Sequence, residues 1–460
     1  MGWMLLWIIP IVFAAGPEQI HLALTGDQSE MNVGWVTMGT GSPTYVSYGL
    51  SATSLTSKSE NSNPKSWTYA GITRVSHNVV LKGLKENTHY FYQISGSSKT
   101  YAFKTLPMDG LGVRICLFGD LGLTGVNFQG EGQSIESLLA AAAANKFDMV
   151  VHIGDIAYDL HSDNGTVGDG YMNKMEPLMA TMPYMVIAGN HEDDNENFTN
   201  YKMRFHMPKN GADDGTFYSF DLGPVHFVGI NTENYGYYYK YGTDSIYTQY
   251  DWLQKDLEMV DRSKTPWLIS YQHRPFYCSN DNSGDCSAFE NQIVRTGFMD
   301  MPGLEPLFLK YGMDMGFWGH EHSYERFYPI ANKVYYNDKD PYNNPDAPVY
   351  IVTGSAGCHS GYADFTNPPL PFSAKQVNDY GYSIMTIKDR STMYLEQISI
   401  EKKDAVVDSV AVIKDVKETN RIKIRRRGHV LPRSNRRSPK CHPKDSRCWA
   451  RSLKKSNTEL

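Results

Sequence analysis

The sequence predicts an N-terminal all-β sandwich followed by an α/β domain in which β-sheets are covered by helices. Residues 18–107 contain short alternating segments between turn residues, whereas apolar strands alternate with helical stretches after Gly112. Five short polar motifs each follow directly on an apolar strand of this second part. The 460 residues, of which 41% are hydrophobic, are enough for two or three domains with a large buried core.

The first part, residues 18–107, shows little helical periodicity and predicts a run of short strands. Six alternating segments are separated by Gly, Ser, Asn and Pro: IHLALTG, MNVGWVTM, TYVSYGL, SHNVVLKGL, HYFYQISG and KTYAFKTL. This spacing is typical of a β-sandwich of about 90 residues. Trp35 and Tyr90 are similar to the tryptophan and tyrosine-corner positions of fibronectin type III modules. Pro107 to Gly110 then predicts a linker.

The second part, residues 112–415, alternates between two kinds of segment. The apolar strands are VRICLF, DMVVHI, YMVIA, WLISY, MDMGFW and PVYIVTG. Helices are expected at residues 133–147, 171–182, 248–262 and 303–311. The first of these contains the run LLAAAAA, which has a strong helical propensity. Strand–helix alternation of this kind predicts an α/β domain.

Residues 1–15 form one apolar run that predicts a cleaved signal peptide. The run is shorter than the ~20 apolar residues that cross a bilayer. Val12 and Ala14 fit the small-residue rule for cleavage, although a buried N-terminal strand is the alternative interpretation. Because no other run reaches membrane length, we expect a soluble protein without a transmembrane segment, secreted or in the endolysosomal lumen.

Six cysteines are compatible with an oxidising compartment. Cys278 and Cys286 lie eight residues apart in a polar loop, and Cys441 and Cys448 lie seven apart near the C-terminus. Both pairs are candidates for small-loop disulfides. Cys116 lies within an apolar strand, so we expect an inert core residue.

Two further features concern the surface of the chain. Asn164 and Asn197 begin N-x-Thr sequons and would be glycosylated in a secreted protein. Residues 416–460 are expected to form a basic, disordered tail. Its last 40 residues hold 14 Lys or Arg against two acids, so a net charge of −6 for the chain conceals −18 before residue 421. Contact with anionic polymers or membranes is the functional alternative for this tail.

The five polar motifs together carry seven side chains that can bind metal ions. These are Asp120 in GDLG, Asp155 and Tyr158 in GDIAY, Asn190 in GNHE, His273 in QHRP, and His320 and His322 in GHEH. Ligands of α/β proteins gather at the carboxyl ends of strands, and neighbouring strands are ~5 Å apart. The spacing of 35 residues from Asp120 to Asp155 and again to Asn190 leaves room for one helical crossover each.

The types of these side chains indicate two unlike metal ions. Carboxylate, phenolate and imidazole make a hard, anionic pocket suited to Fe(III), whereas amide and imidazole groups suit Zn(II), Fe(II) or Mn(II). Taken singly, each residue has an ordinary structural explanation. Asp120 and Asp155 could cap helices or occupy turns, Tyr158 could be a packing residue, and His273 could be a satisfied core histidine. The coincidence of all five motifs favours the metal site.

At this point the chain resembles the purple acid phosphatases, in their long plant-type and animal form, within the calcineurin-like metallophosphoesterases. The resemblance covers about residues 18–415. It implies that Fe(III) is held by Asp120, Asp155, Tyr158 and His322. It also implies that a divalent ion, with zinc favoured over iron or manganese, is held by Asp155, Asn190, His273 and His320, with Asp155 bridging. Tyr158 separates this family from the Ser/Thr phosphoprotein phosphatases, which lack a tyrosine ligand.

The predicted chemistry is hydrolysis of phosphomonoesters at acidic pH by metal-bound hydroxide, because two cations lower the pKa of a bound water. The resemblance implies that His191 contacts the phosphate or the leaving-group oxygen, and orientation of a ligand is its alternative role. Plant members place two further histidines in the loop after the His273 equivalent, whereas residues 274–287 contain none. His161 and His359 could line the mouth of the site. This departure leaves the general acid and the substrate preference open.

The expected partner is a phosphate-ester substrate, and no nucleic-acid partner is predicted. A phosphodiesterase or pyrophosphatase on the same metal site is the first alternative. A non-catalytic binding glycoprotein with a vestigial site is the second, although complete retention of the seven side chains argues against it. The oligomeric state, the second metal and the role of residues 421–460 are left open by the sequence.

Overall fold

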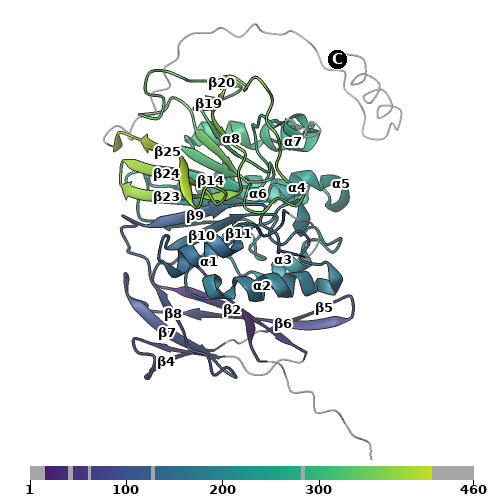
Figure 1. Cartoon of the computed structure of the whole chain (residues 1–460), viewed down its shortest axis with the longest axis vertical. Helices are drawn as coiled ribbons and strands as arrows, with labels where there is room; N and C mark the ends of the chain where they lie inside the picture. Colours follow the sequence, from purple (N-terminus) through teal and green to yellow (C-terminus); the bar gives the residue numbers. More distant parts are fainter. Residues whose placement is uncertain (1–15, 40–44, 61–63, 126–129, 281–284, 417–460) are drawn as a thin grey trace, which may run out of the picture. The chain divides into compact units, whose positions relative to one another are not determined.

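The computed structural model describes residues 16–39, 45–60, 64–125, 130–280 and 285–416 (Figure 1). The expected signal peptide, the basic tail and the Cys441–Cys448 pair lie outside the described residues. Within the described ranges, no helix has both the length and the apolar character needed to cross a bilayer.

The front part of the chain is a β-sandwich of two four-stranded antiparallel sheets. One sheet has the order β1 (Glu18–Ala23), β2 (Met31–Met38), β6 (Ile72–Leu81), β5 (Lys65–Tyr69), and the other β4 (Ser57–Glu60), β3 (Tyr45–Gly49), β7 (His89–Ile94), β8 (Tyr101–Lys104). Trp35 is buried in the core between the sheets. The Tyr90 hydroxyl accepts a hydrogen bond of 2.9 Å from the Lys85 backbone N–H. Both residues therefore occupy the positions expected in a fibronectin-like sandwich.

The second part contains two larger mixed sheets. The six-stranded sheet has the order β11 (Tyr184–Ile187), β10 (Met149–Ile153), β9 (Arg114–Phe118), β23 (Gly381–Asp389), β24 (Thr392–Ser399), β25 (Ala405–Ile413). The seven-stranded sheet has the order β12 (Tyr218–Leu222), β13 (Val225–Ile230), β14 (Trp267–Gln272), β17 (Met315–Trp318), β21 (Val349–Thr353), β18 (Tyr324–Phe327), β22 (Ser373–Val377). Two short hairpins pair β15 (Gly297–Phe298) with β16 (Met301–Pro302), and β19 (Ile330–Ala331) with β20 (Val334–Tyr335).

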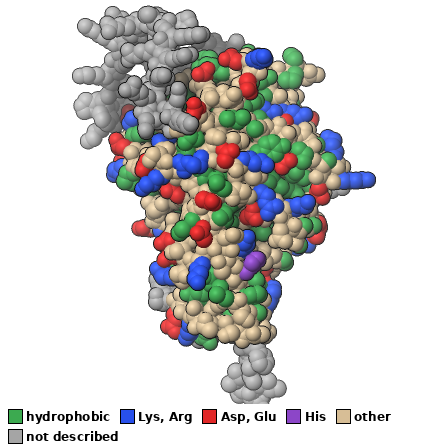
Figure 2. Space-filling view, turned by 90° about the vertical axis from the view of Figure 1, so that its left-hand side faces the viewer, with side chains coloured by type: hydrophobic (Ala, Val, Ile, Leu, Met, Phe, Trp, Pro, Cys, Tyr) green, Lys and Arg blue, Asp and Glu red, His purple; other side chains and the backbone are tan. Residues whose placement is uncertain are grey.

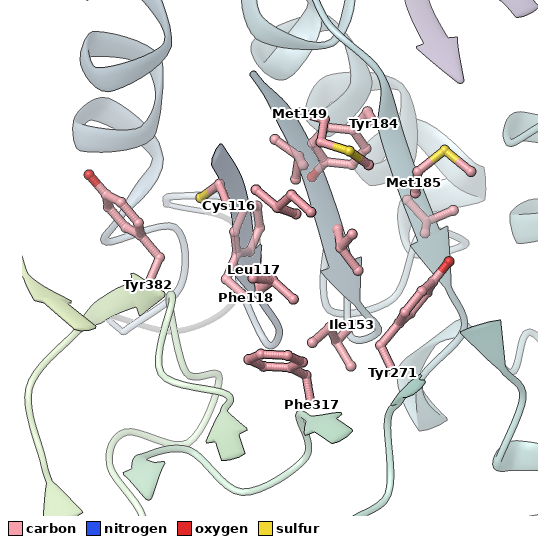
Figure 3. Packing of buried hydrophobic residues seen from close by; sticks show 14 of the residues in the cluster. Cys116, Leu117, Phe118, Met149, Ile153, Tyr184, Met185, Tyr271, Phe317 and Tyr382 are labelled. Atoms are coloured by element: carbon pink, nitrogen blue, oxygen red, sulfur yellow. The ribbon is translucent and has the colours of Figure 1, made fainter. Parts of the chain in front are cut away.

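The two large sheets pack face to face around a common apolar core. Figure 3 shows Phe118 and Ile153 of one sheet near Tyr271 and Phe317 of the other, all fully buried. Strands β9, β10 and β11 run parallel, as do β13, β14, β17 and β21. The carboxyl ends of the strands that precede the five motifs therefore meet along one edge of the packed sheets.

Helices cover the outer faces of these sheets (Figure 1). They are α1 (Ile135–Ala143), α2 (Thr166–Met179), α3 (Thr199–Arg204), α4 (Glu233–Gly236), α5 (Tyr238–Tyr241), α6 (Asp244–Met259), α7 (Phe289–Thr296) and α8 (Leu304–Tyr311). Short 3₁₀ turns are η1 (Asp163–Gly165), η2 (Asn190–Glu192) and η3 (Asp285–Ser287). The four expected helices correspond to α1, α2, α6 and α8, and they provide the predicted α/β architecture.

Helix α2 begins five residues earlier than the sequence predicted. The stretch contains Gly168 and Gly170, which lower helical propensity. A Cβ atom at Gly168 would lie 2.6 Å from the Leu160 carbonyl oxygen and 2.8 Å from Arg204 Nε. Glycine is needed there for close packing, and tertiary contact overrides the weak local preference.

Helix α2 also contacts the front sandwich through a buried polar cluster. Asp169 accepts hydrogen bonds from Arg74 Nη2 at 2.6 Å, Arg204 Nη1 at 2.8 Å and Gln19 Nε2 at 2.9 Å. Arg74 and Gln19 belong to the sandwich, whereas Arg204 ends α3. Next to this cluster the rings of His21 and His206 stack with centroids 6.0 Å apart. We call these six residues the seam.

The surface shown in Figure 2 carries acidic and basic side chains interspersed with apolar ones. Mixed signs of charge are the usual arrangement of a water-exposed protein face.

Candidate metal centre

The seven predicted side chains lie together where five strands end. Asp120 follows β9, Asp155 and Tyr158 follow β10, Asn190 begins the turn after β11, His273 follows β14, and His320 and His322 follow β17. Three of these strands belong to the six-stranded sheet and two to the seven-stranded sheet. The site is therefore formed by both sheets.

Several of these residues adopt backbone conformations that L-amino acids rarely take. The φ angles are positive at Asp120 (59°), Asp155 (51°), Tyr158 (48°) and His320 (71°). Non-glycine residues in this region cost about 1–3 kcal/mol each and tend to cluster at functional sites. The sharp turns point consecutive side chains toward one volume.

One group of four side chains gathers around the Asn190 amide oxygen. His273 Nε2 lies 3.0 Å and His320 Nδ1 2.9 Å from Asn190 Oδ1. His273 Nε2 also lies 3.4 Å from Asp155 Oδ1. The metal-binding atoms of Asp155, His273 and His320 are all within 4.8 Å of one another. His273 Nδ1 contacts the Ile153 carbonyl at 2.9 Å, which turns Nε2 toward the group.

The other three side chains form a second group beside the first. The Tyr158 hydroxyl lies 2.9 Å from His322 Nε2 and 3.4 Å from Asp120 Oδ1. Asp120 Oδ2 accepts a 2.9 Å hydrogen bond from the His320 backbone N–H. Asp120 therefore connects the second group to the loop that carries a residue of the first.

The electrostatics of both groups match a pair of cations. Burial raises the pKa of Tyr158 well above its usual value, and the charges of Asp120 and Asp155 raise it further. Burial also raises the pKa of Asp120, while a hydrogen bond from His322 opposes that rise. Buried carboxylate and phenolate groups are stable in their charged forms when cations lie beside them. The oxygen and imidazole donors therefore fit two metal ions.

Glu192, for which no role is predicted from the sequence, connects the loop after β10 to the loop after β11. The fully buried Glu192 side chain accepts hydrogen bonds from the backbone N–H groups of Asp155 (2.8 Å), Ile156 (2.9 Å) and Gly189 (2.8 Å). Burial, followed by the charge of Asp155, raises the pKa of Glu192 to about 8. Glu192 belongs to the GNHE motif, but two of its three partners lie 36 and 37 residues away in the sequence.

His191 lies beside these groups and is tethered by a carboxylate. Its Nδ1 is 3.0 Å from Asp159 Oδ1, and its ring meets that of Tyr158 at a centroid distance of 4.7 Å. Burial would lower the pKa of His191, but the charge of Asp155 and the hydrogen bond to Asp159 raise it to about 9. The His161 ring contacts that of Tyr69, with centroids 6.2 Å apart.

The loop after β21 wraps the second group. Ser360 Oγ and the Gly361 carbonyl oxygen each lie 3.1 Å from His322 Nδ1. The backbone N–H groups of Gly357 and Cys358 donate to the Asp120 carbonyl at 2.8 and 2.9 Å. Apart from His359, which is expected at the mouth of the site, no residue of this loop is predicted from the sequence to have a role.

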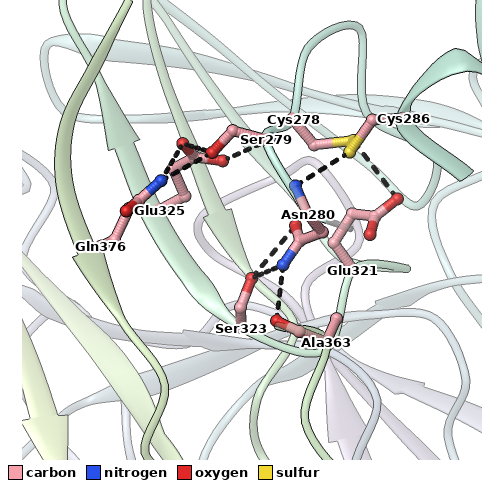
Figure 4. Close-up of a disulfide and its surroundings, with 9 residues drawn as sticks. All are labelled: Cys278, Ser279, Asn280, Cys286, Glu321, Ser323, Glu325, Ala363 and Gln376. Carbon is pink, nitrogen blue, oxygen red and sulfur yellow. Dashed lines mark hydrogen bonds between the residues drawn. A yellow bond between two sulfur atoms is a disulfide. The ribbon is translucent and has the colours of Figure 1, made fainter. Parts of the chain in front are cut away.

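A disulfide joins Cys278 to Cys286, as expected (Figure 4). Cys278 Sγ lies 3.3 Å from Oε1 of the buried Glu321, which separates the two histidines of the GHEH motif. Asn280 Nδ2 donates to Ser323 Oγ at 3.1 Å and to the Ala363 carbonyl at 2.7 Å. The loop without histidines is therefore tied to the turn that carries His320 and His322.

The remaining predicted positions lie on the surface or in the core. Asn164 and Asn197 are exposed, so both sequons are accessible. Cys116 is fully buried, and burial raises the pKa of its thiol well above the usual value, as expected of an inert core residue.

Three family descriptions match successive parts of the chain. Residues 17–105 match the purple acid phosphatase N-terminal domain, and residues 113–324 match the calcineurin-like phosphoesterases. Residues 347–409 match the iron/zinc purple acid phosphatase-like protein C family. Fold and site thus define a metallophosphoesterase that hydrolyses phosphate esters.

Curated relatives match nearly the whole chain. Acid phosphatase type 7 of Danio rerio is 38% identical over 416 residues, covering 87% of this chain and 91% of the relative. Its Homo sapiens counterpart is 37% identical, covering 87% and 92%. Purple acid phosphatase 21 of Arabidopsis thaliana is 32% identical, covering 81% and 79%.

A solved purple acid phosphatase from yellow lupin (Lupinus luteus) seeds has a similar structure, with a TM-score of 0.73 at 26% identity. The match covers 87% of this chain and 75% of the lupin chain. The chain belongs to the purple acid phosphatase family, whose members are binuclear metal enzymes.

Proposed function

We propose that this enzyme is an acid phosphatase that removes phosphate from monoesters at mildly acidic pH, in the secreted or endolysosomal space. The observation that carries the proposal is the meeting of all seven donor side chains in two adjoining groups. The names of the relatives support the acid phosphatase assignment. The exposed sequons at Asn164 and Asn197 support passage through the secretory route.

The metal assignment follows the chemistry of the donors. Fe(III) would be held by Asp120, Asp155, Tyr158 and His322, and a divalent ion by Asp155, Asn190, His273 and His320. When bound, the two cations would polarise the phosphoryl group and acidify a water molecule. Zinc is the preferred second ion, because amide and imidazole donors suit it.

The side chains around this centre would bind and orient the substrate. His191 lies beside Tyr158 and is held by Asp159, so its ring orientation is fixed before substrate arrives. We propose that it hydrogen-bonds the phosphate or the leaving-group oxygen. The proposal assigns residues 18–107 to a front domain, 112–415 to the catalytic domain, and the basic tail to weak contacts with anionic polymers.

The experiment is a metal and substrate analysis of the purified protein. We expect one iron and one divalent ion per chain, and turnover of p-nitrophenyl phosphate between pH 4 and 8 that is greatest on the acidic side. The phosphodiester bis(p-nitrophenyl) phosphate should be turned over more slowly. Faster turnover of the diester would contradict the monoesterase assignment, and a folded, metal-free, inactive protein would contradict the entire proposal.

A further inference from the structure

A second imidazole–carboxylate pair lies at the edge of the metal centre and belongs to neither donor group. His359 Nδ1 is 2.6 Å from Glu131 Oε1. The Glu131 side chain is fully buried, whereas 23% of the His359 side chain is exposed. A hydrogen bond that a buried carboxylate accepts from an imidazole N–H is strong and directional, so the ring orientation of His359 is fixed.

His359 lies next to His191, and both imidazole rings contact the Tyr158 ring. The His359 and Tyr158 centroids are 4.9 Å apart, and the His359 and His191 centroids are 5.3 Å apart. Like His359, His191 is partly exposed and has its Nδ1 held by a carboxylate, Asp159. In both rings Nε2 lies on the side away from that carboxylate. Two oriented, partly exposed imidazoles therefore lie side by side against one phenol ring.

The backbone also fixes the position of His359. The preceding residue, Cys358, has a positive φ of 40° and donates its N–H to the Asp120 carbonyl at 2.9 Å. On the other side, a Cβ atom at Gly130 would lie 2.4 Å from the Cys358 carbonyl oxygen. The segments of Glu131 and His359 thus approach as closely as a glycine allows. Such preorganisation suits a substrate-binding group.

We propose that His359, oriented by Glu131, is a second phosphate-binding side chain of this active site and works beside His191. Its Nε2 hydrogen-bonds a phosphoryl oxygen of the bound monoester. The inference rests on the proposed function of the metal centre. It places the phosphate contact on the loop after β21, in a chain whose residues 274–287 contain no histidine.

The test compares His359→Ala with His89→Ala, which removes an exposed histidine of β7 in the front sandwich. The measurements on metal-loaded protein are kcat and KM for p-nitrophenyl phosphate, the Kd of inorganic phosphate, metal content and the visible spectrum. We expect His359→Ala to lower kcat/KM and phosphate affinity on the order of 10- to 100-fold, the usual cost of losing a hydrogen bond to a charged group. Metal content and spectrum should stay unchanged, and His89→Ala should match the wild type.

The role of Glu131 as a positioning residue is tested by a cycle of variants. Glu131→Gln should lower phosphate affinity less than His359→Ala, and adding it to His359→Ala should cause no further loss. His359→Asn, which keeps a polar side chain, should restore part of the affinity. If His359→Ala does not fold, Glu131→Gln and His359→Asn are measured in its place.

Two outcomes would overturn the inference while leaving the proposed function intact. One is wild-type kcat/KM and phosphate affinity in His359→Ala and His359→Asn. The other is loss of metal or a changed spectrum at unchanged phosphate affinity, which would make His359 a brace for Tyr158. A wild-type protein without metal or turnover would instead overturn the proposed function and this inference together.

Discussion

The metal edge and the seam both contain buried aspartates and histidines, and the two regions use them in opposite ways. At the carboxyl edge of the sheets, Asp120 and Asp155 lie among other acceptors and imidazoles. At the seam, Asp169 meets two guanidinium groups and an amide. The carboxylates of the first region are positioned to be neutralised by bound metal ions. The Asp169 carboxylate is instead neutralised by two arginines of the same chain.

Residue type and burial therefore do not identify a functional site by themselves. Asp169 is nearly as well buried as the ligand candidates, yet its carboxylate accepts its hydrogen bonds from Arg74, Arg204 and Gln19. Burial would raise the pKa of Asp169, but the hydrogen bond from Arg74 and the charge of Arg204 hold it below the usual value. A buried charge that is paired within the chain contributes to stability, whereas one without such a counter-charge is available to bind a metal ion.

The sharpest contrast is expected from Asp155→Asn. Loss of one anionic donor should lower kcat on the order of 10³-fold, because several kcal/mol of transition-state stabilisation depend on the metal centre. The metal-free protein should lose some stability in urea, because the Asp155 carboxylate is held charged by His273 and His191, while relief of its repulsion with Asp120 and Glu192 partly offsets that loss. Activity assays and urea titrations check both parts. If Asp155→Asn lost activity only because it unfolds, the proposed difference between the metal edge and the seam would be refuted.

The matching change at the seam is Asp169→Asn. It leaves the Arg74 and Arg204 guanidinium groups without their carboxylate, so we expect a loss of about 3–5 kcal/mol in unfolding free energy. Turnover per folded molecule should be unchanged, because none of the three residues belongs to the metal edge. Urea unfolding and active-site titration separate these quantities. Wild-type stability would show that the seam is not a structural ion cluster.

A third change addresses the pH response of the seam. Burial lowers the pKa of His21 from 6.5 to about 4, with a hydrogen bond to Gln19 only partly opposing it. Below pH 6.5 the unfolded chain binds a proton that folded His21 excludes until about pH 4. The free energy of unfolding should therefore decrease as the pH is lowered from 6.5 to 4, by about 1 kcal/mol per pH unit for this group.

Urea unfolding at several pH values between 4 and 7 measures that slope. His21→Gln should flatten it, whereas His89→Gln on the exposed surface of β7 should not. Equal slopes in all three proteins would exclude His21 as the source.

The smallest structural change with a distinct readout is Tyr158→Phe. The phenolate bound to Fe(III) should give a visible charge-transfer band, and removing one oxygen should abolish this band with little effect on stability. Tyr394→Phe, on the distant strand β24, is the control and should keep the colour. A band that persists in Tyr158→Phe would place the phenol outside the metal shell.

Much of the fold followed from local pattern. The sandwich, four of the helices and six strands of the second part are predicted by alternation, periodicity and turn residues, whereas strands such as β12, β13 and β24 are not. The start of α2 was not, because Gly168 is required by contacts with Leu160 and Arg204 rather than by helical preference. The division of the strands into two packed sheets was also hidden, since it depends on pairings such as β9 with β23 across more than 260 residues.

The donor side chains were visible because each lies in a short motif behind an apolar strand. Their supports were not, because Glu192, Asp159 and Glu131 are unremarkable acids until their partners are known. Glu131 and His359 are separated by 228 residues, and only folding brings them together.

The kind of chemistry can be predicted from the order and types of residues in the chain. The types of the seven donors, their order and the strands before them are local properties, and metal preference depends on donor type. The orientation of those donor side chains, and the pairing of the other buried charges, can be read only from the tertiary structure. These properties depend on hydrogen bonds and packing between segments far apart in the chain, where no local pattern records the partner.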